Sequence, residues 1–293
     1  MTKIIGVIAL QIVLLCFVPP VVLAEQTPVK LSVSHNSDSD GVSYLSFSMA
    51  TEKKNKPWNF SYSATSINQR DSAARLTEQR FTARWQQRFN EENSVAAWLG
   101  YSYSDNWQFA PFGIQYQGVV NTIDQMWLSY SHDSITTVAA YQNRILSDHF
   151  SWRYRKELDR RLVLDTTIKY SQFSDANYRK TFGLGLTKDF SRRFRLGLAY
   201  LYDTSDIGMR SVFYLPKEES SLSIVPEYGI PLGEGSLVFR LSQSLIARNY
   251  SGNISRTTFG VRYQLDNFAF DVQCYNDGSY SSQDYSVSWT TRW

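Results

Sequence analysis

The last nine residues, 285–293, read Tyr-Ser-Val-Ser-Trp-Thr-Thr-Arg-Trp. Tyr285, Val287, Trp289 and Trp293 alternate with polar residues, and only Thr291 departs from the pattern. Successive side chains of a β-strand point to opposite faces, so this alternation predicts a strand with one apolar face and one polar face. The chain therefore ends on an amphipathic strand.

The same period of two recurs along the chain, whereas helical periodicity is almost absent. In one upstream segment, Leu237, Phe239 and Leu241 alternate with Arg240 and Ser242. Such segments run for about ten residues, the length that a tilted strand needs to cross a bilayer. The mean hydropathy is −0.34, and no apolar run of transmembrane-helix length follows residue 24. We predict an all-β fold, a transmembrane antiparallel up-and-down β-barrel.

The first 24 residues differ from the rest. Lys3 precedes an apolar run from Ile4 to Val18, a proline pair follows, and Val22 and Ala24 fit a cleavage site. This order predicts a secretory signal peptide over residues 1–24, cleaved after Ala24, and a single barrel domain over residues 25–293. Cys16 would leave with the signal, so Cys274 would be the one cysteine of the mature chain and could form no internal disulfide.

Strand assignment from alternation and turn residues gives about 16 strands, with 14 as the alternative, because a barrel with both ends on one side needs an even count. Pro111 and Pro216 favour loops at 105–120 and 204–220. The predicted strands are 28–35, 42–50, 57–68, 78–89, 94–104, 121–131, 134–145, 149–158, 161–172, 178–190, 194–203, 221–230, 236–248, 254–265, 267–275 and 281–293.

Short turns should lie at the periplasmic end of such a barrel. We assign seven there: Lys54-Asn55-Lys56, Glu91-Glu92-Asn93, His132-Asp133-Ser134, Asp159-Arg160, Ser191-Arg192-Arg193, Gly233-Glu234-Gly235 and Asp266-Asn267.

The final strand resembles the C-terminal signature of bacterial outer-membrane barrels, in which a terminal aromatic residue follows alternating apolar positions. Tyr285, Val287, Trp289 and Trp293 match that signature. The resemblance implies residence in outer-membrane lipid and recognition by the barrel-assembly machinery. In its short turns and strand number the chain also resembles YaiO-type proteins and the barrels of exopolysaccharide-export porins. That likeness implies transport, with a possible link to envelope polysaccharide.

Basic residues gather on the polar face of the predicted strands. Charged side chains facing lipid cost about 2–4 kcal/mol near the midplane, so we expect these residues to face the lumen. Rings of one charge set pore selectivity, and arginine binds carboxylates and hydroxyls, which favours anionic or carbohydrate solutes. A lumen filled by ion pairs with Glu157, Asp165, Asp271 and Asp284 remains open as an alternative. The basic set is Arg80, Arg84, Arg88, Arg153, Arg155, Lys169, Arg195, Arg240, Arg248, Arg256, Arg262 and Arg292.

The sequence leaves two alternatives to a channel: a lipid hydrolase, and a structural or adhesive barrel. His132 and Ser134 resemble the His-x-Ser of outer-membrane lipid hydrolases, but position 146, where those families supply the third group, is leucine. The predicted periplasmic turn also separates His132 from the outer leaflet. We therefore predict no catalytic residue, and a structural or adhesive barrel with a closed lumen is the other alternative. Scattered histidines predict no metal site and no cofactor, and a formal charge of +3 does not favour nucleic acid.

Overall fold

The computed structural model describes residues 28–38, 42–51, 57–69, 74–104, 107–121, 124–135, 137–206, 217–248, 252–265, 268–277 and 281–292. The predicted signal peptide, residues 1–24, lies outside these ranges, as does Trp293.

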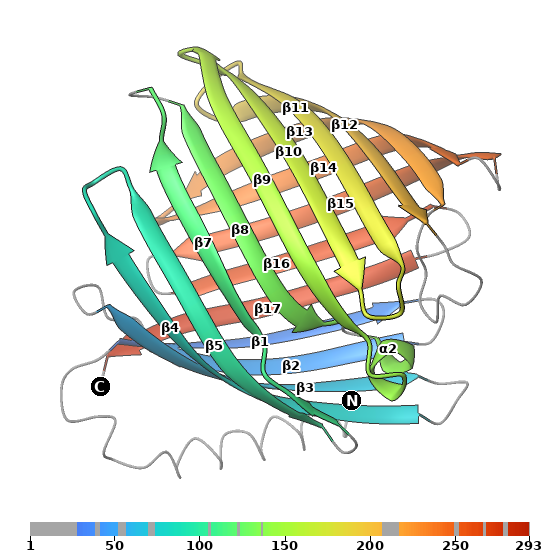
Figure 1. The fold of residues 1–293 in the computed structure, drawn as a ribbon. Helices are drawn as coiled ribbons and strands as arrows, with labels where there is room; N and C mark the ends of the chain where they lie inside the picture. Colours follow the sequence, from blue (N-terminus) through green and yellow to red (C-terminus); the bar gives the residue numbers. More distant parts are fainter. Residues whose placement is uncertain are drawn as a thin grey trace, which may run out of the picture.

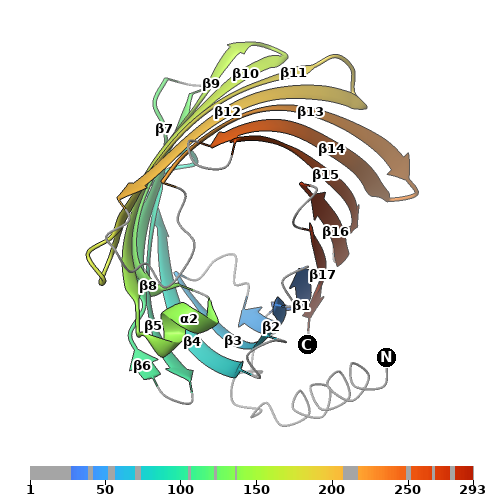
Figure 2. The ribbon, with the colours of Figure 1, turned by 90° about the vertical axis from the view of Figure 1, so that its right-hand side faces the viewer.

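All described strands belong to one sheet of 17 segments in which neighbours along the chain pair antiparallel. The sheet closes because β1 pairs with both β2 and β17, and the strands form a barrel around a central space (Figures 1 and 2). The segments are β1 (Pro28–Asp38), β2 (Val42–Thr51), β3 (Trp58–Gln69), β4 (Ala74–Arg88), β5 (Ser94–Ser104), β6 (Trp107–Phe109), β7 (Phe112–Val119), β8 (Gln125–Ser134), β9 (Leu146–Asp159), β10 (Leu162–Phe173), β11 (Tyr178–Asp189), β12 (Phe194–Asp206), β13 (Glu218–Leu232), β14 (Gly235–Arg248), β15 (Gly252–Leu265), β16 (Phe268–Asn276) and β17 (Ser281–Arg292), with a short helix α2 (Val138–Gln142) between β8 and β9.

β6 and β7 together occupy one position in the wall. Both pair with β5 in the same register, since Ser102 faces Phe109 and Leu99 faces Phe112. Pro111 interrupts the pairing because it has no N–H, yet its carbonyl still accepts the Gly100 N–H at 2.7 Å. The barrel therefore has 16 wall strands, the number predicted from the sequence.

Two errors in the predicted strand order cancelled in that count. The predicted loop 105–120 is wrong, because β6 and β7 continue the wall past Pro111. The predicted strand 134–145 is also wrong, because this segment leaves the wall and contains α2. Its run of β-branched residues favoured a strand, but Thr137 caps the helix instead, its side chain accepting the Ala140 N–H at 3.1 Å.

The barrel has two rims. We call the rim where β1 begins and β17 ends the terminal rim, and the opposite one the loop rim. The terminal rim carries connections 52–57, 89–93, 120–124, 160–161, 190–193, 233–234 and 266–267. The loop rim carries 39–41, 70–73, 105–106, 135–145, 174–177, 207–217, 249–251 and 277–280.

The predicted turn at His132-Asp133-Ser134 is wrong, because these residues end β8 at the loop rim. The turn that precedes β8 is 120–124, so the predicted strand 121–131 starts too early. Four of the other predicted turns, at 91–93, 159–160, 191–193 and 233–235, coincide with terminal-rim connections. The predicted turns Lys54-Asn55-Lys56 and Asp266-Asn267 lie outside the described residues. The predicted loop 204–220 overlaps the end of β12 and the start of β13, and its residues 207–216 lie outside the described residues.

The two faces of the wall differ in chemistry. Large apolar side chains stand on the outer face, with Phe81 56% and Leu99 62% exposed. Near the terminal rim this face carries aromatic residues such as Trp58, Phe190 and Phe194, which fits an interfacial aromatic girdle. Among the residues that the structure describes, no helix has the length and apolarity to cross a bilayer. The strands form a transmembrane β-barrel.

Candidate functional site: the inner wall of the barrel

The inner face carries the basic residues singled out in the sequence. Strand register places all twelve opposite the apolar outer face. Arg292 holds an inner-face register position opposite Pro28. Alternation within single strands was sufficient to find this face. Register also adds Lys30 and Arg179, which the sequence analysis missed although each lies in the same period of two.

One contact shows that this face points inward. Arg80 lies on β4 and Asp133 on β8, and two wall strands separate them. Their side chains nevertheless form a double hydrogen bond, with nitrogen–oxygen distances of 2.7 and 2.8 Å. Only side chains on the concave side of the wall can meet across intervening strands.

Towards the loop rim, the arginines are held by carboxylates. Arg80 also donates to Glu78, whose side chain is only 7% exposed and which accepts the Ser102 hydroxyl. Arg179 pairs with the buried Asp203. Arg248 continues the pattern, because it pairs with Glu219 at 2.7 Å. Arg256 differs: it forms no ion pair with a described residue, and its guanidinium carbon lies 4.6 Å from the ring centroid of Tyr275.

Connection 135–145 folds onto this part of the inner face. Tyr141 is 3% exposed, packs edge-on against Trp107 and accepts the Ser134 hydroxyl at 3.0 Å. Burial, together with the neighbouring Glu78 carboxylate, raises the pKa of the Tyr141 phenol. Ala140 packs in a small apolar cluster with Phe173, an inner-face residue of β10. In Figure 2, α2 overlaps the wall near β4 and β5, and these contacts with Trp107 and Phe173 place the segment against the inner face at the loop rim.

A histidine lies in the same region. The two ring nitrogens of His149 lie 2.7 Å from the hydroxyls of Ser147 and Ser171, which sit on either side of it. Ser147 in turn donates to the Asp133 carbonyl at 3.1 Å. These bonds connect β8, β9 and β10 across the inner face and fix their side chains below α2.

Towards the terminal rim, the ion pairs are exposed to the lumen. Arg262 pairs with Asp271 at 2.7 Å although its side chain is 58% exposed. Arg153 pairs with Asp165 at 2.7 Å, and Arg195 with Asp189 at 2.6 Å. A hollow of about 550 Å³ beside Arg195 opens at this rim between β12 and β14. Exposed pairs of this kind leave space for water and solute.

Several basic side chains of the inner face have no carboxylate partner. Within the described ranges, none forms an ion pair, although Arg84 reaches Gln115 at 3.5 Å. Glu157 and Asp284, predicted to neutralise arginines, also hold inner-face positions but form no ion pair with a described residue. Asp165 and Asp271, from the same prediction, form ion pairs with Arg153 and Arg262. Among the described inner-face residues, the cations without an ion pair are Lys30, Arg84, Arg88, Arg155, Lys169, Arg240 and Arg256.

The predicted His-x-Ser pair lies on the outer face at the loop rim. His132 Nδ1 lies 2.9 Å from Asp148 Oδ1 on the neighbouring strand, and Tyr130 donates to the same oxygen at 2.5 Å. Ser134 is buried and its hydroxyl donates to Tyr141. The topological reason for separating His132 from the outer leaflet is therefore wrong. However, the described side chains show no hydrogen bond from Ser134 to His132.

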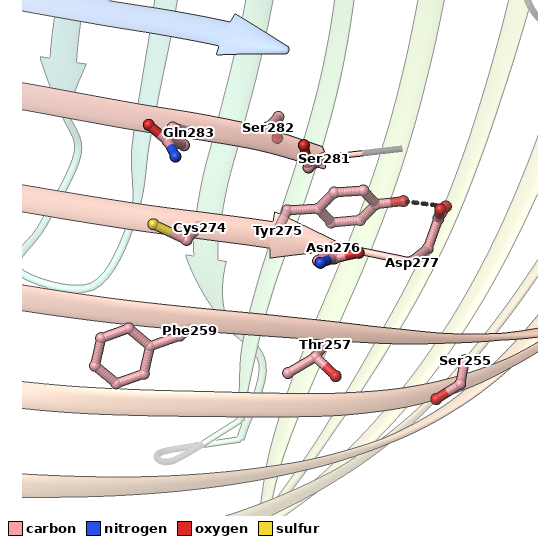
Figure 3. A pocket seen from close by; sticks show the side chains of 10 residues that line it. All are labelled: Ser255, Thr257, Phe259, Cys274, Tyr275, Asn276, Asp277, Ser281, Ser282 and Gln283. Atoms are coloured by element: carbon pink, nitrogen blue, oxygen red, sulfur yellow. Dashed lines mark hydrogen bonds between the residues drawn. The ribbon is translucent and has the colours of Figure 1, made fainter. Parts of the chain in front are cut away.

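A second hollow, of about 710 Å³, lies near the loop rim between β15 and β17. Most of its lining residues hold outer-face register positions, including Ser255, Thr257, Cys274 and Gln283 (Figure 3). Cys274 is a free thiol. This hollow interrupts the apolar outer surface at the level where a barrel meets lipid headgroups.

The predicted assembly-signal residues lie in or beyond β17. Tyr285, Val287 and Trp289 hold outer-face positions opposite His35, Val33 and Leu31 of β1. Trp293 lies outside the described residues.

No protein-family model matches the chain, and no curated protein matches it in sequence. Solved structures do. A bacterial polysaccharide outer membrane secretin aligns over 90% of this chain and 98% of its own, with 10% identity and a TM-score of 0.72. The chain folds as a bacterial outer-membrane β-barrel.

Two more solved structures show the same fold. OccD3 (OpdP) of Pseudomonas aeruginosa aligns over 91% of both chains, with 9% identity and a TM-score of 0.52. CdiB from Acinetobacter baumannii is 10% identical with a TM-score of 0.57, over 91% of this barrel and 60% of that protein. At such low identities, structural similarity establishes the fold alone. The function has to be argued from the residues of the inner wall.

Proposed function

We propose that this barrel is an outer-membrane channel that passes anionic or carbohydrate solutes. One observation carries the proposal: Arg84, Arg88, Arg155 and Arg240, from three different parts of the wall, hold inner-face positions and form no ion pair with any residue that the structure describes. A ring of one charge in a low-dielectric wall concentrates ions of the opposite charge.

The width of the barrel supports the same function. Barrels of 16 strands are wide enough to enclose an aqueous channel, whereas eight-stranded ones are filled by their own side chains. The arginine Arg262 is more than half exposed inside this barrel. Arginine also suits the proposed solutes, because its planar donors match carboxylates and hydroxyls.

The placement of the rims follows from the class of the fold. In bacterial barrels both chain ends and the shorter turns lie in the periplasm. The terminal rim then faces the periplasm, and the loop rim with α2 faces outward. The last strand, with Tyr285, Val287 and Trp289, would be the part that the barrel-assembly machinery recognises. A role in envelope polysaccharide export is compatible with the barrel's similarity to the bacterial polysaccharide outer membrane secretin.

The proposal is tested by charge selectivity in planar bilayers. The purified, folded protein should conduct, and its reversal potential in a salt gradient should indicate preference for the anion. Replacing Arg84, Arg88, Arg155 and Arg240 together by glutamine should move the reversal potential towards zero. The matched control, Arg262→Gln with Asp271→Asn, removes one charge of each sign and should leave it unchanged. Absence of single-channel current in the unmodified protein would remove the channel proposal.

A second candidate, lipid hydrolysis at the outer surface, is favoured by the contact between His132 and Asp148. A histidine oriented by a carboxylate is two parts of a nucleophile–base–carboxylate arrangement. The hydroxyl of Ser134 points to Tyr141 instead of His132, which weighs against it. Release of fatty acid from phospholipid vesicles by the folded protein, abolished in His132→Ala, would establish this activity. No release from the unmodified protein would exclude it for those lipids.

A further inference from the structure

The inner wall carries aromatic rings beside its arginines. Trp98 on β5 holds an inner-face position opposite both Arg84 and Gly113. The guanidinium carbon of Arg84 lies 5.9 Å from the centroid of the Trp98 ring. The same guanidinium reaches the side-chain oxygen of Gln115 at 3.5 Å. An indole ring, a cation and an amide therefore converge on one patch of the lumen wall.

The flat position of this ring depends on a glycine. A Cβ added to Gly113 would lie 2.1 Å from Cζ2 of Trp98, well inside any permitted contact. The indole lies directly against the backbone of β7 because position 113 has no side chain. The face of the ring that does not lie against β7 is on the lumen side, where the Arg84 guanidinium lies near it.

A second patch of the same composition lies closer to the terminal rim. Trp127 on β8 holds an inner-face position opposite Arg153, and the Arg153 guanidinium carbon lies 5.1 Å from its ring centroid. Gly113, which faces Trp98 on one side, faces Ser131 of β8 on the other. Ser131 lies four residues beyond Trp127 in the direction of the loop rim. At about 3.3 Å per residue, the two indoles are separated by roughly 13 Å in the strand direction.

We infer that Trp98 and Trp127, with Arg84 and Arg153, form a binding track for a linear oligosaccharide that carries carboxylates, such as a polyuronate. The inference rests on the proposed channel function and names its substrate class. The apolar faces of sugar rings stack on the indoles, and Arg84, which forms no ion pair with a described residue, binds the carboxylates of the same sugar units. Arg153 donates to Asp165 through Nε and Nη2, so its contribution to solute binding comes from Nη1, which forms no hydrogen bond with a described residue. A small inorganic anion would need the arginines but no aromatic surface.

The track continues towards the terminal rim through cations without an ion pair. Arg155 lies on β9 beyond Arg153, and Arg88 lies on β4 beyond Arg84. In the other direction, Phe109 and Trp107 stack at 4.6 Å below α2, with Arg80 5.7 Å from the Phe109 centroid. Arg80 is already paired with Glu78 and Asp133. The region around Phe109 and Trp107 therefore borders the track but supplies no cation for a solute carboxylate.

The experiment measures interruption of single-channel current by two sugars of equal length. One is a β-1,4-linked oligoglucuronate, and the other is the corresponding cello-oligosaccharide, which lacks the carboxylates. The oligoglucuronate should block longer. Trp98→Leu and Trp127→Leu should each weaken its block roughly tenfold and should weaken the cello-oligosaccharide block as well, whereas Arg84→Gln should affect the oligoglucuronate alone.

Controls separate the track from the channel itself. Tyr101→Leu removes an aromatic ring from the outer face of the same strand and should change neither block. If Trp98→Leu does not fold, Gly113→Ala displaces the indole from the wall and should reproduce its effect. Unchanged block in the tryptophan variants of a conducting, anion-selective protein would overturn the track and leave the channel standing. A protein that passes no current would overturn both.

Discussion

The two halves of the lumen use the same residue type for different purposes. Near the loop rim, Arg80 and Arg248 are held by carboxylates that are largely withdrawn from water, and the folded connection 135–145 lies beside Glu78, the partner of Arg80. Near the terminal rim, Arg262 and Arg195 form ion pairs that are exposed to the lumen. Arg84 forms no ion pair with a residue that the structure describes. Arginine is thus a structural cross-link in one half and a solvated charge in the other.

The difference shows why a count of lumen arginines does not determine selectivity. A paired and buried guanidinium contributes little net field, whereas an exposed one without a counter-charge attracts anions. The selective part of the channel therefore belongs to the terminal half. The loop half fixes the shape of the entrance, through Tyr141 and the bonds around Glu78.

The largest effect is expected from Arg80→Leu. The substitution leaves the buried carboxylate of Glu78 and the partly buried one of Asp133 without a cation. Loss of one member of a buried pair should lower the free energy of unfolding by about 3 kcal/mol. Urea unfolding in lipid vesicles, followed by tryptophan fluorescence, measures the change. A loss no larger than that of Arg262→Leu would mean that the two halves do not differ.

A smaller effect is expected from Tyr141→Phe, which removes one buried hydroxyl and should cost about 1 kcal/mol. Burial raises the pKa of the Tyr141 phenol, so the unfolded chain loses this proton first as the pH rises above the ordinary value of 10.0. The contribution of Tyr141 is complete below that pH and is lost above it. Unfolding curves at neutral and alkaline pH should therefore show a smaller alkaline loss in Tyr141→Phe than in the unmodified protein; equal losses would contradict the assignment.

The smallest effect is expected from Arg262→Leu in the terminal half. The pair with Asp271 is exposed, and exposed pairs contribute about 0–1 kcal/mol. The same urea assay should place this variant within that range. A cost as large as that of Arg80→Leu would show that the terminal half is also closed to water.

The sequence was sufficient for the fold class because the period of two is a local property. It persists through β14, β15 and β17 whatever those strands pair with. The inner-face placement of Arg240 and Arg262 follows from the same alternation. Register between neighbours then adds only which residue lies opposite which.

The errors arose where local preference and tertiary context disagree. Pro111 is a strand breaker in isolation, but a single lost N–H is tolerated because the register on either side is preserved. Residues 134–145 are rich in β-branched side chains, yet the segment leaves the wall and buries Tyr141. Likewise, the partnership of Arg80 with Asp133 joins strands that are not neighbours, and alternation within one strand carries no information about such a contact.

The pairing of β1 with β17 has a consequence for folding. Val33 meets Val287 across this seam, and the two residues stand at opposite ends of the chain. Until β17 pairs with them, β1 and β16 each present a row of unpaired backbone groups that can pair with other chains. Contacts between such distant residues also form slowly, because a very long loop must close. Pairing of β17 with both strands closes the barrel and removes both exposed rows.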